Sequence, residues 1–215
     1  SMAAYTLSTL TEIKDPFLKV VDRENMMAIL QEQKLQLSGV VDDKTAVEVG
    51  KLVGAQVILT GTVLKFEEKK GFVNSDTRTA YQSYLEKQVS NGQEVMVTKY
   101  KAVNYTDYSG KSSVTMDFQL KVVSLKTGEL LRTKMINKKM EDEIHYAKSD
   151  IARDNLFPGS DGRVETANDR VQSFRGLFTA RRDLKSVGDL TTEAYNKTAR
   201  EIANDVKSLM QELVK

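Results

Sequence analysis

The sequence predicts an α/β (α+β) fold, with a mixed sheet that contains an antiparallel hairpin, flanking helices and a closing C-terminal helix. Three observations support this class. Helix and strand patterns alternate between residues 20 and 66, apolar and polar residues alternate strictly from 114 to 123, and an amphipathic helix begins near residue 190. Together these patterns indicate a sheet that is covered by helices.

The chain begins with a predicted helix over residues 3–14, where apolar residues recur at roughly helical spacing. Asp15-Pro16 ends this helix, because a proline disfavours helical geometry in the residue before it. A short strand is then expected over residues 17–21.

Two helices and a strand are predicted next, over residues 22–35, 43–53 and 56–66. Gly54 suits the left-handed cap at the end of the second helix. The run Val57-Ile58-Leu59 is apolar at consecutive positions, which is typical of a central strand covered on both faces. This alternation predicts at least one parallel crossover.

The composition changes after residue 66 and becomes polar and rich in tyrosine. We expect a short helix at about residues 80–89. The turn signal Asn91-Gly92 follows it, and a strand is then predicted over residues 94–105.

The clearest strand is predicted over residues 114–123. Its apolar residues all face one way, so that Met116, Phe118 and Leu120 must be buried together. A turn at 126–128 then predicts an antiparallel return strand over 129–138.

The last third of the chain predicts a turn at 158–162, a helix over 164–182 and a closing helix from about residue 190. The closing helix has one apolar stripe at three- and four-residue spacing. Its members are Tyr195, Ala199, Ile202, Val206, Leu209 and Leu213.

We expect a single domain over residues 1–215, with polar insertions at about 67–113 and 139–188. A chain of 215 residues that is 40% apolar can bury a sizeable core. The net charge is only +2, from 32 basic and 30 acidic residues, so the charge balance gives no footprint for nucleic acid. The chain has no cysteine, which excludes disulfides and thiolate metal sites.

Few residues could carry catalytic chemistry. The one histidine, His145, follows the acidic residues 141–143, which could supply further metal ligands. A surface histidine among solvated charges explains the same pattern. The chain lacks the phosphate-binding pattern G-x-x-x-x-G-K-[ST] and has no serine in a G-x-S-x-G motif. We therefore expect no catalytic residue, no metal and no cofactor.

A possible nucleic-acid signal lies where lysines and tyrosines occur close together, at Lys99, Tyr100 and Lys101. In a strand, however, Tyr100 points away from both lysines. The near-neutral net charge also argues against a nucleic-acid partner.

A continuous run of motifs extends from Val20 to Val63. In order, the motifs are Val20-Val21-Asp22-Arg23-Glu24, Glu32-Gln33, Leu37-Ser38-Gly39, Thr45-Ala46-Val47, Gly54-Ala55 and Thr60-Gly61. This order resembles the curli production assembly/transport family, outer-membrane lipoproteins that build the secretion channel for curli subunits. Thr127-Gly128-Glu129 also matches a strand–turn–strand motif that recurs in this family.

The resemblance implies a periplasmic domain that is associated with the outer membrane and contacts other envelope proteins or copies of itself. Family members form a ring, and each subunit contributes two hairpins to the membrane, which would fall at about residues 67–113 and 136–188 here. Lys99 and Lys101 share a strand face with Val95, which disfavours a lipid-facing strand. We expect soluble elaborations instead, and membrane contact only through a lipid anchor that this chain does not carry.

The family motifs also supply candidates for an interface between subunits. Glu24 lies in a first helical turn, where the helix dipole alone favours an acid, so a structural role explains it equally well. The candidates are Arg23, Glu24, Glu32, Gln33, Gly54, Gly61, Thr127, Gly128 and Glu129.

The leading hypothesis is a non-enzymatic periplasmic domain of a curli-assembly-like lipoprotein, acting through protein–protein contacts in a secretion or envelope complex. The first alternative is an adaptor or activator lipoprotein domain that docks on a cell-wall synthase. The second alternative is an enzyme of unrecognised type, which would need a deep pocket with converging carboxylates around His145.

Overall fold

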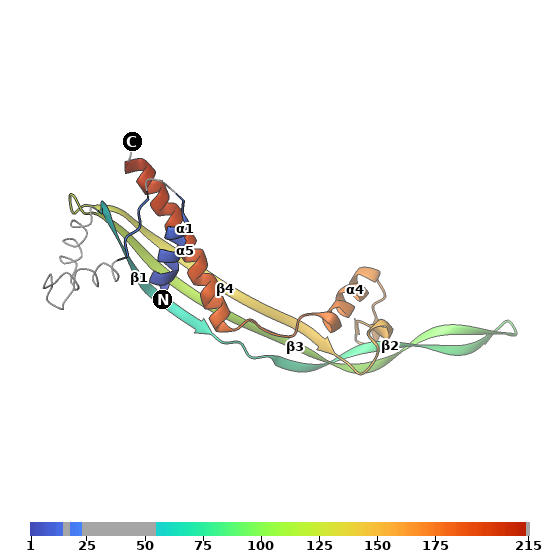
Figure 1. Cartoon of the computed structure of the whole chain (residues 1–215). Helices are drawn as coiled ribbons and strands as arrows, with labels where there is room; N and C mark the ends of the chain where they lie inside the picture. The colour runs from blue at the N-terminus through green and yellow to red at the C-terminus, as the bar shows by residue number, and fades with distance from the viewer. Residues whose placement is uncertain (15–17, 23–54, 214–215) are drawn as a thin grey trace. The chain divides into compact units, whose positions relative to one another are not determined.

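The computed structural model describes residues 1–14, 18–22 and 55–213, and the chain divides into two compact units (Figure 1). A five-stranded sheet of order β1-β3-β2-β5, with β4 paired to β3, supplies strands to both units. The first unit comprises Ser1–Glu68, Val114–Met140 and Gly188–Lys215, and the second comprises Lys69–Ser113 and Glu141–Val187.

Three strands form the sheet of the first unit. They are β1 (Val57–Lys69), the last part of β3 (Gln93–Ser124) and the first part of β4 (Leu130–Lys148). The predicted turn and antiparallel return strand are confirmed as the connection between β3 and β4, although β4 extends ten residues beyond the predicted end at residue 138.

Burial alternates strictly along the last part of β3, from Val114 to Val122. Val114, Met116, Phe118, Leu120 and Val122 are buried, whereas the residues between them are half-buried or exposed. The pleat of a strand sends successive side chains to opposite faces, so one face of this strand lies in the core. This confirms the predicted strand and the joint burial of its three central apolar residues.

The C-terminal helix α5 (Val187–Leu213) supplies the other half of this core. It confirms the predicted closing helix and most of the predicted stripe, although Tyr195 is only half-buried and Leu213 is exposed. Its buried residues are Leu190, Ala194, Thr198, Ala199, Ile202, Ala203, Val206, Leu209 and Met210.

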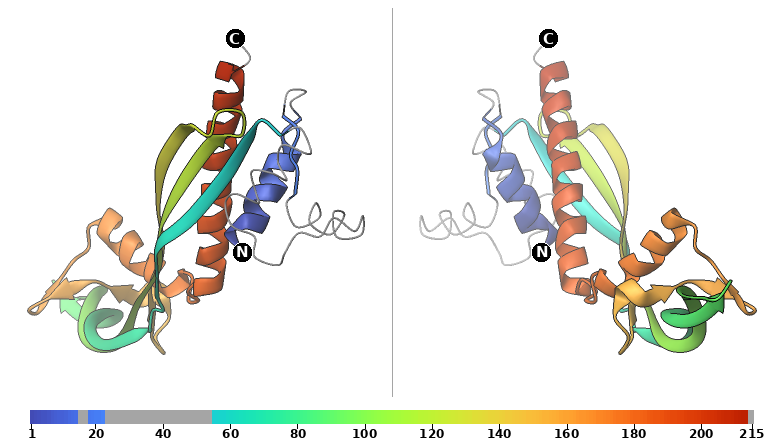
Figure 2. Two further views of the ribbon diagram at one scale, coloured as in Figure 1. Left: turned by 90° about the vertical axis from the view of Figure 1, so that its left-hand side faces the viewer. Right: turned by 90° about the vertical axis from the view of Figure 1, so that its right-hand side faces the viewer.

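The N-terminal helix α1 (Met2–Glu12) confirms the predicted first helix and buries Met2 and Leu10. It lies next to α5 (Figure 2). The ring centroids of Tyr5 and Tyr195 are 5.5 Å apart, and Phe66 of β1 lies 6.2 Å from the same Tyr195 ring. Tyr195 therefore joins α1, α5 and β1.

Two predictions for the N-terminal part are wrong. Residues 18–22 contain no strand, whereas a strand was expected over 17–21, of which residue 17 lies outside the described residues. β1 is not a strand covered on both faces, because residues 57–59 are half-buried and residues 60–69 are exposed. Within the sheet that the described strands form, β1 pairs with β3 alone and stands at one end of the strand order.

The helices expected over 22–35 and 43–53 lie outside the described residues. No parallel crossover is seen in the part of the chain that the structure describes. The α+β class, with an antiparallel hairpin, flanking helices and a closing C-terminal helix, is confirmed. None of the described helices is both long enough and apolar enough to cross a membrane.

A long hairpin dominates the second unit. β2 (Asn74–Ser90) pairs with β3 in an unbroken antiparallel register that ends at Ser90 and Gln93. Asn91 and Gly92 connect the strands with φ angles of 53° and 79°, the conformation that Asn-Gly favours in a two-residue hairpin turn. The helix expected over 80–89 is therefore wrong, because cross-strand pairing with β3 determines the conformation of this segment.

After β4, the chain of the second unit forms several short elements. They are η1 (Arg153–Asn155), β5 (Leu156–Phe157), β6 (Gly159–Ser160), β7 (Arg163–Val164), α4 (Asn168–Gly176) and η2 (Leu177–Thr179). The helix predicted over 164–182 is confirmed only in its middle, as α4. Ala80, Leu156 and Phe174 are the buried centre of this unit, and Tyr105 and Phe178 pack against them.

Leu120→Ala tests the core of the first unit. Leu120 is 2% exposed, so the truncation should lower the free energy of unfolding by about 2–5 kcal/mol. The matched control is Leu64→Ala, because Leu64 is 55% exposed on β1 and its loss should cost no more than about 0.5 kcal/mol. Urea unfolding of both variants measures the difference, and equal costs would contradict the proposed core.

Candidate functional site

Gly61, a family-motif candidate on β1, makes room for the ring of Phe118. A Cβ atom added at Gly61 would lie within 2.2 Å of Phe118 Cζ, far closer than atoms approach without a bond. The ring belongs to the buried face of β3. Gly61 is thus required by packing in the first unit, which gives it a structural reason independent of any interface.

The other described candidates, Thr127, Gly128 and Glu129, form the turn between β3 and β4. Gly128 has a φ of +75°, a backbone angle that residues with a side chain rarely adopt. The Thr127 hydroxyl donates to Glu129 Oε2 at 3.0 Å and accepts from the Glu129 amide at 3.3 Å. Ser124 Oγ accepts a hydrogen bond from the Thr127 amide at 3.2 Å. The turn is therefore held by its own side chains.

These candidates do not converge on one site. The turn is tied to the residue before β1, because the Leu125 amide donates to the Gln56 carbonyl at 2.9 Å. Gly61 instead packs against Phe118 further along β1. The remaining candidates lie outside the described residues. They are Arg23, Glu24, Glu32, Gln33 and Gly54.

A set of ion pairs joins α5 to β4 in the first unit. Arg132 lies 3.3 Å from Asp205 and 2.9 Å from Glu212, and Lys134 lies 3.3 Å from Glu201. The basic residues lie at alternate positions of β4, so they point to the face on which the acids of α5 lie. The ion pairs are therefore matched to the position that the helix takes along the strand.

Glu201 of α5 contacts two lysines of β4, Lys134 and Lys138. Lys138 donates a hydrogen bond to it, which lowers the pKa of the Glu201 carboxyl below its ordinary value. Partial burial acts in the opposite direction, and Lys134 adds a further lowering effect. The charged form of Glu201 is therefore the form that the fold prefers.

His145 lies in a different cluster, in the second unit. Its Nε2 is 2.8 Å from Asp107 Oδ1, and Arg78 Nε is 3.0 Å from Asp107 Oδ2. Asp107 is 6% exposed, and each of its two carboxylate oxygens has a partner within the protein. Among the described residues, no three His, Cys, Asp or Glu side chains lie together as metal ligands would.

The Asp107 carboxylate also affects the pKa of the neighbouring Tyr105. Burial raises the pKa of Tyr105, and the negative charge of Asp107 adds to this effect. Arg78 acts in the opposite direction. Two donors already occupy Asp107, so it organises the sheet and is not placed as a free base.

The outer part of the β2–β3 hairpin exposes three large apolar side chains on one face. Leu85, Val89 and Met96 are 64%, 75% and 55% exposed, and the register places Met96 opposite Lys87. Directly opposed residues share a face, so Leu85, Lys87, Val89 and Met96 point the same way. We call Leu85, Val89 and Met96 the outer hairpin face, which is a candidate interaction surface.

Sequence reasoning missed this surface because β2 was expected to be partly helical. The available signal was Asn91-Gly92, which is typical of a hairpin with a strand on each side. The opposite face of the hairpin carries Val95, Lys99 and Lys101 at alternate positions of β3, as the sequence indicated. Lys99 is paired with Glu86 there.

A family match covers residues 13–148, more than half of the chain. The family is described as curli production assembly/transport component CsgG. The matched residues include Gly61 and the turn at 127–129. No curated protein matches the chain.

Gly61→Ala should destabilise the first unit by about 1–3 kcal/mol, because the new methyl group and the Phe118 ring compete for one volume. In a Phe118→Leu background the same change should cost less than about 0.5 kcal/mol, since the ring is gone. Gly176→Ala is the matched control, because a Cβ there meets no atom within 4 Å. A double-mutant cycle by urea unfolding measures the coupling, and additive effects would refute it.

Glu201→Gln tests the ion pairs between α5 and β4. Because the folded-state pKa of Glu201 is lowered, its stabilising contribution is complete above the unfolded pKa of about 4.3 and is lost as the pH falls through the lower folded value. The variant should therefore lose less stability than the wild type between about pH 5 and pH 3. Glu12→Gln is the control, because Glu12 is an exposed acid for which the described residues offer no ion pair. Parallel curves of unfolding free energy against pH for Glu201→Gln and the wild type would rule out this role.

Proposed function

This chain belongs to the curli production assembly/transport component CsgG family, and we propose that it is a non-enzymatic domain that acts through protein–protein contacts in an outer-membrane secretion or envelope complex. The family match over residues 13–148 carries this proposal. We place the domain in the periplasm, associated with the outer membrane. The family is defined by assembly and transport, which concerns contacts between proteins rather than catalysis.

The domain organisation that accompanies this proposal is one family domain over residues 1–215, with polar insertions at about 67–113 and 139–188. The division of the chain supports it. Lys69–Ser113 and Glu141–Val187, two segments that are separate in sequence, make up one compact unit. The other unit contains the two described family motifs, Gly61 and the turn at 127–129.

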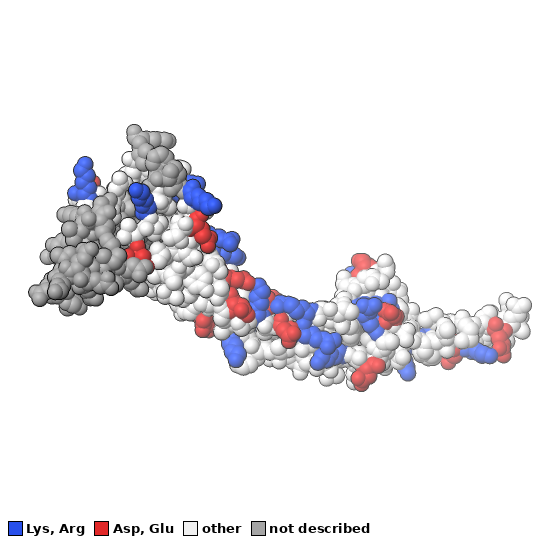
Figure 3. All heavy atoms as spheres, viewed as in Figure 1, with Lys and Arg blue, Asp and Glu red and all other residues white. Residues whose placement is uncertain are grey.

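We propose the outer hairpin face as a contact surface for another envelope protein or for a second copy of this chain. An exposed group of large apolar side chains costs solubility and is typical of an interaction site. Acidic and basic residues are interspersed on the face seen in Figure 3, and the net charge is +2. Recognition should therefore depend on apolar contacts more than on long-range attraction.

The alternative, an activator domain that docks on a cell-wall synthase, uses the same kind of surface with a different partner. The two possibilities differ in the composition of the complex that this chain would form. A secretion channel would contain many copies of this chain, whereas an activator would be recovered as a monomer or dimer with a synthase.

The triple variant Leu85→Gln, Val89→Thr, Met96→Gln tests the outer hairpin face. In the full-length protein extracted from membranes in detergent, it should weaken the native complex by about tenfold or more, because buried apolar anchors dominate interface energies. Native mass and chemical cross-linking measure this loss. Circular dichroism should remain unchanged, since all three side chains are exposed.

Leu130→Gln is the matched control, because Leu130 is an exposed leucine of the first unit. It should leave the complex intact. If the triple variant keeps the wild-type native mass and cross-links, the outer hairpin face is not the contact surface. If neither self-association nor an envelope partner is found for the wild type, the proposed function itself fails.

A further inference from the structure

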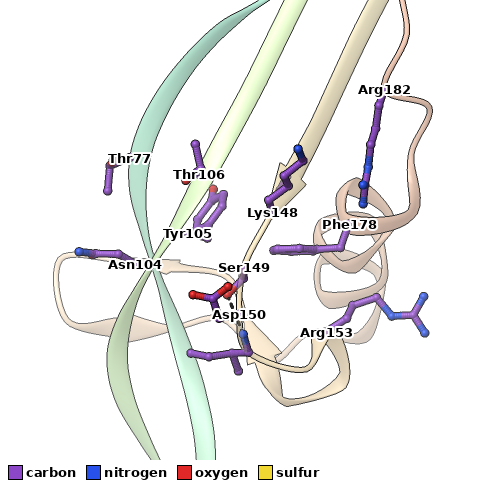
Figure 4. Close-up of a pocket in the computed structure, with 12 residues that line it drawn as sticks. Thr77, Asn104, Tyr105, Thr106, Lys148, Ser149, Asp150, Arg153, Phe178 and Arg182 are labelled. Atoms are coloured by element: carbon purple, nitrogen blue, oxygen red, sulfur yellow. Dashed lines mark hydrogen bonds between the residues drawn. The ribbon is translucent and has the colours of Figure 1, made fainter.

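A cavity with a volume of about 490 Å³ lies in the second unit (Figure 4), and none of the residues that line it belongs to the outer hairpin face. Every residue that lines it belongs to β2, β3, the end of β4 or the segments that follow β4. Its volume falls in the range of small-molecule sites, which is about 300–1,000 Å³. Such sites combine an apolar wall with a few polar groups that determine orientation.

The inner wall of this cavity is apolar. Ala147 is buried, and Tyr105, Ile151 and Phe178 are half-buried. The rings of Tyr105 and Phe178 are 5.9 Å apart, and each packs edge-on against Phe174. The wall is therefore part of the core of the second unit and exists before a ligand arrives.

Two cations at the rim have no carboxylate partner among residues 1–14, 18–22 and 55–213. Lys148 Nζ lies 5.2 Å from the centre of the Tyr108 ring, and Arg182 lies 5.9 Å from the centre of the Tyr146 ring. These tyrosine rings stack with centroids 4.6 Å apart. Ring faces attract the cations but do not neutralise them. Within the described part of the chain, neither cation forms a salt bridge.

Neighbouring cations of the same unit are paired. Arg181, beside Arg182 in sequence, lies 2.7 Å from Asp142. Arg153, the third cation that lines the cavity, lies 3.1 Å from Asp154. Asp150 also lines the cavity. Asp154 balances the charge of Arg153, and Asp150 balances one of the two charges of Lys148 and Arg182. The cavity lining therefore carries a net charge of +1.

We propose that this cavity binds a monovalent carboxylate that is attached to an apolar or aromatic group. The carboxylate lies between Lys148 and Arg182, and the apolar group lies against Phe178 and Ile151. A guanidinium and an ammonium form strong, charge-assisted hydrogen bonds with a carboxylate. A dianionic phosphate fits the charge balance less well, because Asp150 would repel its second charge.

The test uses a matched pair of probes on the intact chain. N-acetylphenylalanine carries a carboxylate beside an aromatic ring, and N-acetylphenylalaninamide has the same shape without the charge. We expect the acid to bind with a dissociation constant of about 1 mM and the amide at least about tenfold more weakly, measured by NMR titration. Equal shifts with both probes, or none with the acid at about 20 mM, would overturn the proposal.

Substitutions assign the binding to this cavity. Lys148→Gln and Arg182→Gln should each weaken binding of the acid by about three- to tenfold, and Asp150→Asn should strengthen it. Arg163→Gln is the control, because Arg163 is an exposed cation that lines a different cavity. Equal weakening by Arg163→Gln would mean general attraction by positive charge and would reject the site.

Two further probes distinguish the possible sources of the ligand. Phenyl phosphate in place of N-acetylphenylalanine should bind more weakly, and tighter binding of the phosphate would reject the carboxylate. A tripeptide ending in phenylalanine that binds as well as N-acetylphenylalanine supports a peptide C-terminus as the ligand. The triple variant of the outer hairpin face should leave all these titrations unchanged, so that this site and the proposed function fail or succeed separately.

Discussion

The fold of the first unit depends on the burial of alternate side chains of β3. Five of them, from Val114 to Val122, enter the core to which α5 contributes its apolar stripe. Small residues of the helix, such as Ala194 and Ala199, permit close approach, and the missing side chain of Gly61 does the same for the ring of Phe118. The ion pairs of Arg132 and Lys134 follow from this contact, because the apolar packing places the acidic residues of α5 opposite the basic residues of β4.

Sequence reasoning succeeded where the decisive interactions repeat within a short window. The period of two over 114–123 and the three- and four-residue spacing after residue 190 each determine which face is buried. It failed for residues 80–89, whose apolar residues Ala80, Tyr84 and Leu85 also suit a helix. The strand is stabilised there by hydrogen bonds to residues 94–103, which no local window contains.

The candidate sites show the same division. Gly61 and the turn at 127–129 could be selected from sequence, but the reason for Gly61 lies in Phe118, far along the chain. Lys148 and Arg182 carry no sequence signal. They become neighbours of the same tyrosine ring only because the chain returns to β4 after η2. Asp107 and His145 likewise meet only through the pairing of β3 with β4.

The Asn91-Gly92 turn has a consequence for how this hairpin can vary. A two-residue turn fixes one pairing register. In that register, the number of residues between a side chain and the turn determines the face to which the side chain points. If each strand lost one residue, the side chains between the deletion and the turn would change faces. The apolar side chains at 85 and 89 would then leave the outer hairpin face, and the polar ones at 86 and 88 would take their place. Relatives whose hairpins differ in length should therefore keep the same surface only when each strand gains or loses an even number of residues.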